Sequence, residues 1–415
     1  MQLQTIGARK GMLLFILAYS LIIEPLMAPS PPPALPSPAP AAQALSAELE
    51  RHIQAVIEAS GGWISFARYM ELALYAPGLG YYSAGSVKLG GSGDFVTAPE
   101  ITPLFARTLA RQVRELIEGG LTEIVEVGAG SGALAADLLL ALAAMRCLPA
   151  RYSILEVSAD LRERQRARIS QTAPDLVERV QWLDVLPRRM RAILVANEVL
   201  DAIPTHIVRR HDGAIEELGL ILSAHDGRFE RNYRAATGEL LAAAAALDLP
   251  EGYETELNLA ARAFVKSFAA SMERGALIFI DYGFPAAEYY HPQRSRGTLM
   301  CHYRHHAHDD PFVFVGLQDI TAHVDFSAVA DAGFGMGLRV LGFTSQAQFL
   351  VNCGIIDILS ETQPADVRSY APLAGQAQKL LSPAEMGELF KVLALGRGID
   401  RPLLGFARGD RTHTL

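Results

Sequence analysis

The sequence has few cysteines, and no two of them form a CxxC pair. Cys147, Cys301 and Cys353 are an odd number at wide spacings, which argues against a disulfide framework and against a thiolate zinc site. Long runs of basic residues are also missing, and the formal net charge is -8. Because phosphate binding relies on clustered Lys and Arg, a nucleic-acid surface is not expected. We therefore expect a globular protein of a reducing compartment.

The sequence also has no apolar run of the length that a membrane-spanning helix needs. Arg9 and Lys10 precede the run 11-GMLLFILAYSLII-23, which is short for a span but has the length of a signal-peptide core. The Pro-rich stretch 29-PSPPPALPSPAP-40 follows and cannot form a packed core. Export, a weak anchor and a gene start extended upstream of Met27 all fit these residues. We favour the extended gene start, because the rest of the sequence is typical of an intracellular enzyme. The expected protein is then cytoplasmic and has no stable membrane span.

Strands and helices alternate in the middle of the chain. Half of the 415 residues are hydrophobic, which is enough for one elaborated domain or two closely packed ones. The apolar pattern predicts strands over 124–127, 152–155, 180–183 and 192–196, with helices over 133–144 and 159–170. Such alternation implies right-handed crossovers and a parallel sheet, so the predicted class is α/β.

The segments on either side of this alternation have different patterns. Residues 46–75 have apolar positions at helical spacing, and 77–105 is a Gly- and aromatic-rich segment too irregular for regular structure before a helix near Pro103. Two Asp-Gly pairs within 205–234 predict an inserted antiparallel ribbon. Helices over 239–247 and 257–272, a strand over 276–280 and closing elements around 339–352 and 403–408 complete the prediction. The expected segments are therefore 1–45, 46–120, 121–204, 205–273, 274–408 and 409–415.

A glycine-rich turn follows the first predicted strand of the alternation, in 124-IVEVGAGSGALAADLLLAL-142. Gly128, Gly130 and Gly132 remove side chains where the strand turns into a helix, so a ligand can contact the backbone and the helix N-terminus. Gly128, Gly130 and Ala133 also satisfy the looser dinucleotide pattern. A dinucleotide, S-adenosylmethionine and a plain tight turn therefore remain open on the turn alone.

Polar residues at successive strand ends favour S-adenosylmethionine. This cofactor has no pyrophosphate but has a cationic sulfonium and an amino-acid end, which favour nearby acids. Glu126 lies two residues before the first glycine, Glu156 follows the next strand, where it can accept both ribose hydroxyls, and Asp184 follows the third, where it can accept from an adenine amino group. Asn197 ends the fourth strand and is placed for the cofactor. These groups converge on the carboxyl edge of a parallel sheet, where such folds bind ligands.

Several longer strings resemble one known family. They are EVGAGSGAL, ILEVSADLRERQ, ANEVLDAIP, GDFVTAPEI, IDYGF and GTLMCHYRHHAHDDPFVFVGLQDITAHVDF. Over residues 48–408 they resemble the MidA-like class I methyltransferases, which include the mitochondrial respiratory complex I assembly methyltransferase. The resemblance implies a seven-stranded, Rossmann-like class I methyltransferase sheet with an N-terminal helical extension and an inserted antiparallel β-ribbon, with S-adenosyl-L-methionine as cofactor. It implies a protein partner in addition, because the eukaryotic branch symmetrically dimethylates an arginine of a complex I subunit. This chain looks like a bacterial member.

The resemblance also assigns cofactor residues. The methionine end of the cofactor is expected near the glycine turn, the ribose near the end of the second strand and the adenine near the end of the third. A loop over 93–100 is expected to cover the pocket. The candidates are Asp94, Phe95, Thr97, Glu126, Gly128, Ala129, Gly130, Gly132, Glu156, Val157, Asp184, Val185 and Asn197. This chain departs from many relatives, which have Pro or Arg in the glycine turn where it has Ala129 and Ser131.

Catalysis of methyl transfer depends mainly on alignment and charge. An arginine acceptor stays protonated in water, so a site must orient one nitrogen through carboxylates. Glu198, Asp201 and Glu100 are the candidates, with helix capping or surface ion pairs as the alternative for the first two.

Two further segments are candidates for the acceptor side. We expect no metal in the segment 302-HYRHHAHDD-310, because its neighbouring cysteine has no partner. His302, Tyr303 and Arg304 are instead expected to shape the acceptor channel, or to form a structural loop. Asp281 and Tyr282 line the site or simply end their strand.

Three functional interpretations remain from the sequence. The favoured one is an enzyme that methylates a protein arginine, with a link to respiratory complex I assembly. Methylation of a small molecule is an alternative, and a chaperone-like assembly factor that retains the fold is another. NAD-dependent chemistry is an outsider. The sequence does not indicate an oligomeric state.

Overall fold

The computed structural model describes residues 35–84, 96–363 and 365–415. The chain divides into Met1–Ser37 and Pro38–Leu415, and all elements described below belong to the second unit. Of the helices in these ranges, none is both long and apolar enough to cross a membrane. All three cysteines are free.

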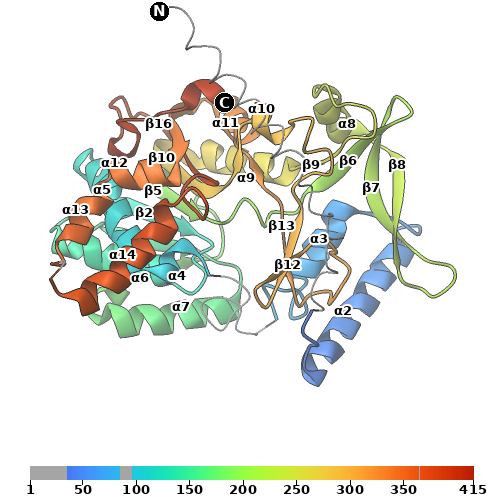
Figure 1. Ribbon diagram of the computed structural model, residues 1–415, viewed down its shortest axis with the longest axis horizontal. Helices are drawn as coiled ribbons and strands as arrows, with labels where there is room; N and C mark the ends of the chain where they lie inside the picture. Colours follow the sequence, from blue (N-terminus) through green and yellow to red (C-terminus); the bar gives the residue numbers. More distant parts are fainter. Residues whose placement is uncertain (1–34, 85–95, 364) are drawn as a thin grey trace, which may run out of the picture. The chain divides into compact units, whose positions relative to one another are not determined.

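A mixed sheet forms the centre of this unit (Figure 1). Its strand order is β15-β16-β10-β5-β2-β3-β4, and the short β14 (Val324–Asp325) pairs with β10 as an eighth strand. The strands are β2 (Glu123–Val127), β3 (Arg151–Leu155), β4 (Val180–Leu183), β5 (Met190–Asn197), β10 (Met272–Phe284), β15 (Arg339–Ser345) and β16 (Phe390–Arg397). Strands β4, β3, β2, β5 and β10 are parallel, whereas β16 is antiparallel to both of its neighbours. The predicted α/β class is confirmed, and the main path of the sheet has the seven strands that were expected.

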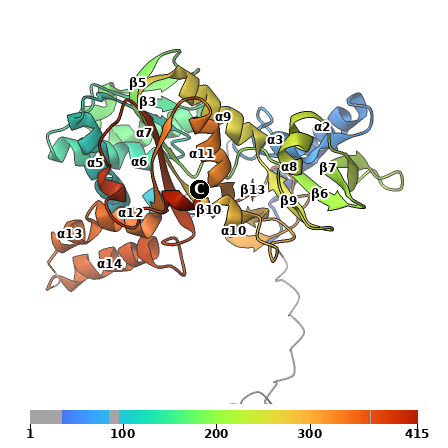
Figure 2. The same cartoon turned by 90° about the horizontal axis from the view of Figure 1, so that it is seen from above.

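Helices cover both faces of the sheet because side chains alternate along each strand. Ile124 and Ile193 lie in a core with α5 (Pro103–Glu118) and α6 (Ala133–Ala144). The adjacent Val125 and Leu194 lie in a second core with α9 (Leu259–Ser271) and α11 (Phe326–Phe334). Figure 2 shows α5 and α6 on the other side of the sheet from α9 and α11. The helices α7 (Ala159–Thr172), α12 (Gln346–Asn352), α13 (Ile355–Ser360) and α14 (Val367–Leu381) contribute to the first core.

A second sheet is built from the inserted ribbon. It has the order β1-β7-β6-β9, with β8 paired to β7, and its strands are β1 (Ile64–Ser65), β6 (His206–His211), β7 (Ala214–Leu222), β8 (Phe229–Ala235) and β9 (Glu254–Leu257). The helices α2 (Pro40–Ala59) and α3 (Phe66–Tyr75) share a core with Leu218 and Leu220 of β7. Both Asp-Gly turns connect antiparallel strands, because glycines at positive φ complete the turns.

Several features of the chain differ from the sequence prediction. The last strand of the large sheet is β16, which was not predicted, and 403–408 contains only the short 3-10 helix η2 (Leu404–Phe406). A short strand, β9, precedes α9. Helix α2 begins at Pro40, within the expected segment 1–45 and before the helical pattern expected from residue 46.

The C-terminal tail covers the edge of the large sheet at β15. The amide of Phe343 donates to Asp410 Oδ1 at 3.0 Å, and its carbonyl accepts from the Arg411 amide at 2.6 Å. The Thr344 hydroxyl donates to the Gly409 carbonyl at 2.7 Å. These bonds satisfy backbone groups that an open edge strand would expose.

Candidate active site

A cavity of about 700 Å³ lies at the carboxyl ends of β2, β3 and β5. Parallel strands with helical crossovers place their following loops at this edge, which is where the sequence predicted a ligand. The predicted residues that line the cavity are Thr97, Glu100, Glu126, Gly128, Ala129, Gly130, Glu156, Val157, Asn197 and Glu198. The structure therefore brings most of the expected cofactor residues and two of the expected catalytic acids to one place.

Glycine is required in the turn between β2 and α6 for two different reasons. Gly128 has φ 63°, and a Cβ there would lie 3.0 Å from Val199 Cγ2. Gly132 has φ 84° and precedes α6, and a Cβ there would lie 3.1 Å from the Cα of Gln165. Gly128 leaves backbone open toward the cavity, whereas Gly132, which is not among the lining residues, allows close packing of the turn against α7.

Glu126 is a buried acid at the end of β2. Its side chain accepts a hydrogen bond from the Tyr152 hydroxyl at 2.6 Å. Burial raises the pKa of Glu126 to about 7, and the nearby charge of Glu156 acts in the same direction, while the Tyr152 bond opposes both. A cation in the cavity would stabilise the ionised form. Glu126 can therefore bind a positively charged group.

Glu156 follows β3 and lines the cavity beside Val157, whose side chain is exposed. Its Oε1 accepts from the Ser158 amide at 2.9 Å, and its Oε2 accepts from Gln165 Nε2 at 3.1 Å. Burial raises the pKa of Glu156, and these bonds and the positive charge of Arg162 oppose that rise. The fixed carboxylate is suited to accept hydrogen bonds from hydroxyl groups in the cavity.

Glu198 begins the turn after β5 in a left-handed conformation, with φ 54°. Its amide continues the sheet by donating to the Ile280 carbonyl at 2.8 Å. Its carboxylate accepts from the Ala98 amide at 3.3 Å and from Asn197 Nδ2 at 3.1 Å. Burial raises the pKa of Glu198 to about 8, and the charge of Asp201 adds to the rise. Strain in a non-glycine residue at a cavity wall is typical of a functional position.

Asp281 and Asp201 lie behind this turn and are not among the lining residues. Asp281 Oδ2 accepts from the amides of Val199 at 3.1 Å, Leu200 at 2.9 Å and Asp201 at 3.4 Å. Burial, together with the charges of Asp201 and Glu198, raises the pKa of Asp281 well above its usual range. The geometry favours an anchor for the Glu198 turn rather than the predicted contact with the acceptor.

Asp201 is also buried, and burial raises its pKa to about 6. The Tyr282 side chain forms a hydrogen bond with it. The Tyr282 ring packs edge-on against His323 and Phe390, with centroid distances of 5.0 and 5.4 Å. Tyr282 thus contacts the turn through Asp201. Its predicted contact with the acceptor remains a prediction.

Glu100 is held by two partners. Its carboxylate accepts from Arg168 Nη1 at 3.0 Å and bonds to the Ser131 hydroxyl within the glycine turn. The pair with Arg168 leaves the Glu100 side chain only 10% exposed. These bonds tie α4 (Ala98–Ile101) to the turn, so the geometry favours a positioning role, and the catalytic assignment of Glu100 stays a prediction.

The two residues predicted to bind adenine lie outside the cavity lining. Asp184 accepts from Arg162 Nη1 at 2.7 Å, and Arg162 also donates to the Glu156 carbonyl at 2.6 Å. Val185 is exposed. Two further predicted cofactor residues, Asp94 and Phe95, lie outside the described residues.

The segment around His302 lies on a separate three-stranded sheet. This sheet contains β11 (Met300–Tyr303), β12 (His306–His308) and β13 (Asp319–Thr321). Tyr303 is buried against Phe314, with ring centroids 5.0 Å apart. The Arg304 guanidinium lies over the Tyr303 ring, and the Arg304 backbone has a φ of 47°. His302, Tyr303 and Arg304 do not line the cavity, so their role in an acceptor channel stays a prediction.

Several site residues were not predicted from the sequence. Tyr75 and Tyr82 form one wall of the cavity and stack with their ring centroids 5.4 Å apart. The Tyr82 hydroxyl bonds to Asp319 at 3.0 Å, and the Tyr75 hydroxyl bonds to the Ala202 carbonyl at 2.9 Å. The aromatic composition of 77–105 was a sequence signal for Tyr82, whereas Tyr75 lies at the end of the preceding helix and had none.

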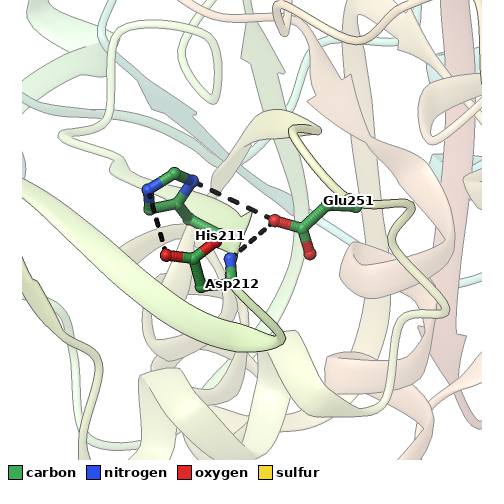
Figure 3. Close-up of side chains that lie close together, drawn as sticks. All are labelled: His211, Asp212 and Glu251. Carbon is green, nitrogen blue, oxygen red and sulfur yellow. Dashed lines mark hydrogen bonds and ion pairs between the residues drawn. The ribbon is translucent and has the colours of Figure 1, made fainter.

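One exposed group outside the cavity has the composition of a metal site. His211, Asp212 and Glu251 lie together beside a hairpin turn (Figure 3). The Glu251 carboxylate accepts from the Asp212 amide at 2.6 Å and from the Gly213 amide at 3.2 Å. Because these bonds explain the arrangement as a clamp on the turn, we assign no metal to it.

The sheet order and the cavity define a class I, S-adenosylmethionine-dependent methyltransferase fold. Residues 104–344 match the family described as S-adenosyl-L-methionine-dependent methyltransferase. The chain belongs to this family, and the expected family and cofactor are thereby confirmed.

The chain is similar to several particular proteins. A Burkholderia thailandensis protein, crystallised with S-adenosyl-homocysteine, is 52% identical and has a TM-score of 0.89, with 92% of this chain and 100% of that chain covered. The mitochondrial protein arginine methyltransferase NDUFAF7 homolog of Drosophila melanogaster is 28% identical, with 91% of this chain and 92% of that protein covered. The human protein arginine methyltransferase NDUFAF7 is 26% identical, with 83% and 82% covered.

The residues of the cavity fit the cofactor of this family. The turn at Gly128 leaves backbone open, Glu156 offers a fixed acceptor for hydroxyls, and Glu126 offers negative charge for a cation. Asn197 Oδ1 is a buried acceptor without a hydrogen-bond partner among the described residues. Each of these features matches a chemical group of S-adenosylmethionine.

Proposed function

We propose that this enzyme methylates an arginine side chain of a protein. The relatives named as protein arginine methyltransferases support this acceptor, at 26% to 28% identity over most of the chain. The observation that carries the proposal is the Glu198 turn. It places a strained, buried carboxylate in the cavity wall, with Asp201 behind it.

A guanidinium group suits this turn better than a neutral acceptor does. The Glu198 carboxylate lines the cavity and accepts from the Ala98 amide and from Asn197 Nδ2. A carboxylate has further lone pairs to offer, and a planar cation with several N–H donors can pair with it through two parallel bonds. The positive charge would also lower the pKa of Glu198, which its surroundings raise to about 8.

The chain's own residues would then orient the acceptor and manage its proton. When bound, S-adenosylmethionine supplies an electrophilic methyl group on a cationic sulfur. Glu198 would hold one guanidinium edge and concentrate the positive charge there, which leaves another nitrogen more nucleophilic. The same carboxylate can accept the proton that the methylated nitrogen loses. Tyr75 and Tyr82, which line the same cavity, would exclude water from it.

The family resemblance suggests which protein to test first. It points to a subunit of respiratory complex I, methylated symmetrically, and we propose that acceptor for this chain. A cytoplasmic location is part of the same proposal, and the three free cysteines support it.

Labelled methyl transfer tests the proposal. The full chain is incubated with isotopically labelled S-adenosylmethionine and a bacterial extract, and the labelled products are identified by mass spectrometry. Gly130→Val is the control, because Gly130 has φ 53° and lines the cavity, where a branched side chain is strained. We expect label on a protein arginine with the wild type and none with the variant.

Two other outcomes would contradict the proposed acceptor. Label confined to small molecules would indicate a small-molecule methyltransferase. Wild-type protein that binds S-adenosyl-homocysteine but transfers no label to any fraction would indicate an assembly factor that retains the fold.

A further inference from the structure

A single buried amide, that of Gln165, joins three parts of the cofactor site. Gln165 lies on α7, is 0% exposed and is not among the lining residues. Its Nε2 donates to the Gly130 carbonyl at 3.0 Å and to Glu156 Oε2 at 3.1 Å. Its Oε1 accepts from Trp182 Nε1 at 2.8 Å. The side chain therefore connects the glycine turn, the acid after β3 and the strand β4.

The chemistry of these partners fixes the orientation of the amide. An indole N–H only donates, so it must face the carbonyl oxygen of Gln165. A backbone carbonyl and a carboxylate face Nε2 because they accept. Gln165 Nε2 thus donates to both the Gly130 carbonyl and the Glu156 carboxylate, and the bond from Trp182 prevents the amide from flipping.

Close packing adds a second constraint at the same place. A Cβ on Gly132 would lie 3.1 Å from the Gln165 Cα and 3.3 Å from its Cβ. The turn and α7 therefore approach each other more closely than a side chain at position 132 would allow. Of the residues of α7, only Gln165 and Ile169 are buried, so Gln165 makes the buried polar part of this contact. Arg168, which is partly exposed, adds a bond from Nη1 to the Ser131 hydroxyl at 2.9 Å.

We propose that Gln165 is a positioning residue for S-adenosylmethionine, which sets the distance between the glycine turn and the Glu156 carboxylate. The role concerns the methyl donor and does not depend on the identity of the acceptor. Without the amide, Glu156 loses a side-chain donor and the Gly130 carbonyl loses its partner. Both groups would then sample other positions, and the cofactor would have to order them on binding.

The first test compares Gln165→Met with Gln112→Met. Gln112 is the matched control, because it is also a fully buried amide with two polar partners, Glu115 Oε2 at 2.8 Å and the Gly405 amide at 2.8 Å, and it does not line the cavity. Calorimetry with S-adenosyl-homocysteine should show about tenfold weaker binding for Gln165→Met, which corresponds to the loss of one to two buried hydrogen bonds. Gln112→Met should lose thermal stability and bind as the wild type does. Equal affinities for wild type and Gln165→Met, within about twofold, would overturn the proposal.

A second variant, Gln165→Glu, should change the pH dependence of S-adenosyl-homocysteine binding, which the loss of a purely structural side chain would not change. At low pH the introduced carboxyl group and that of Glu156 can share a proton, which restores a donor to Glu156, whereas at high pH both ionise and repel. Glu126 and Glu198 are present in both proteins, so the effect of their titration on binding is common to both. Dividing the dissociation constant of the variant by that of the wild type removes this common effect. This ratio should rise about tenfold or more between about pH 5.5 and pH 8.5. A ratio that stays constant over this range would overturn the proposal, even where Gln165→Met fails to fold.

Discussion

Asp281 offers the sharpest test of how the Glu198 turn is built. Two roles were open for this acid from the sequence, a contact with the acceptor or the end of a strand. In the structure, its Oδ2 accepts from three successive amides, those of Val199, Leu200 and Asp201. The same turn contains Glu198 at φ 54°. These three amides have no other acceptor among the described residues. Asp281 therefore stabilises the strained turn by accepting their hydrogen bonds.

The expected loss can be estimated for Asp281→Ala. Asp281 Oδ1 also accepts from the Tyr282 amide at 2.9 Å. Each buried hydrogen bond contributes roughly 1 kcal/mol net, so the loss of all four should reduce the free energy of unfolding by about 4 kcal/mol. Burial, together with repulsion from Asp201 and Glu198, raises the pKa of Asp281. Asp281→Asn keeps an oxygen for the three turn amides and removes that repulsion, but its Nδ2 would face the Tyr282 amide, so the bond at Oδ1 is lost. The substitution should therefore reduce the stability by only about 1 kcal/mol.

Urea unfolding and steady-state kinetics together distinguish the two roles. For an anchor, Asp281→Ala lowers both the stability and kcat, because Glu198 moves, while Asp281→Asn retains most of both. Asp325→Ala is the control for stability alone, since it removes the cap on α11 and the acceptor of the Tyr290 hydroxyl. It should cost about 2 kcal/mol without affecting kcat. Wild-type stability of Asp281→Ala, combined with a raised KM for the acceptor in Asp281→Asn, would refute the anchor and support an acceptor contact.

Three further predictions concern the cavity itself. Glu198→Gln should lower kcat about a hundredfold and leave the affinity for S-adenosyl-homocysteine unchanged. Because only the ionised Glu198 orients a cation, wild-type kcat/KM should rise with pH, with a midpoint of about 8. A kcat/KM that does not change with pH across this range would contradict the role. Gly132→Ala should destabilise the protein by about 1 kcal/mol in thermal unfolding and weaken S-adenosyl-homocysteine binding in calorimetry, since its Cβ meets Gln165 at positive φ; a gain in stability would argue against the close packing. Tyr152→Phe removes a bond that lowers the pKa of Glu126, so that pKa should move above about 7 and cofactor binding should require a higher pH; an unchanged pH dependence of binding would show that Glu126 does not contribute.

The parallel strands of the large sheet were largely predictable from the sequence. They are buried on both faces and therefore read as short apolar runs, and helical periodicity separates them. The glycine turn and Glu156 were predictable for a similar reason, because strand ends in such a sheet meet at one edge. Strand β16 was missed, since 390-FKVLALGR-397 follows a long helical segment and pairs with β10 and β15 from distant parts of the chain.

The roles of individual side chains were less predictable. An acid after a strand has the same sequence signal whether it faces a ligand or a turn, and only the backbone of 199–201 shows that Asp281 faces the turn. Asp184 has the expected position after β4, but Arg162 from α7 pairs with it. Gln165 has no motif, because its function depends on three elements that meet only in the folded chain.

Calorimetry of S-adenosyl-homocysteine binding to the wild type and to Glu156→Ala tests the site most directly. Glu156 lies at the end of β3 with its carboxylate fixed by Ser158 and Gln165, and a carboxylate that accepts from two hydroxyls should account for about a hundredfold in affinity. We predict binding by the wild type, no binding of NAD, and a loss of about that size in the variant. Affinities within about twofold of each other would contradict a nucleoside site at this edge of the sheet.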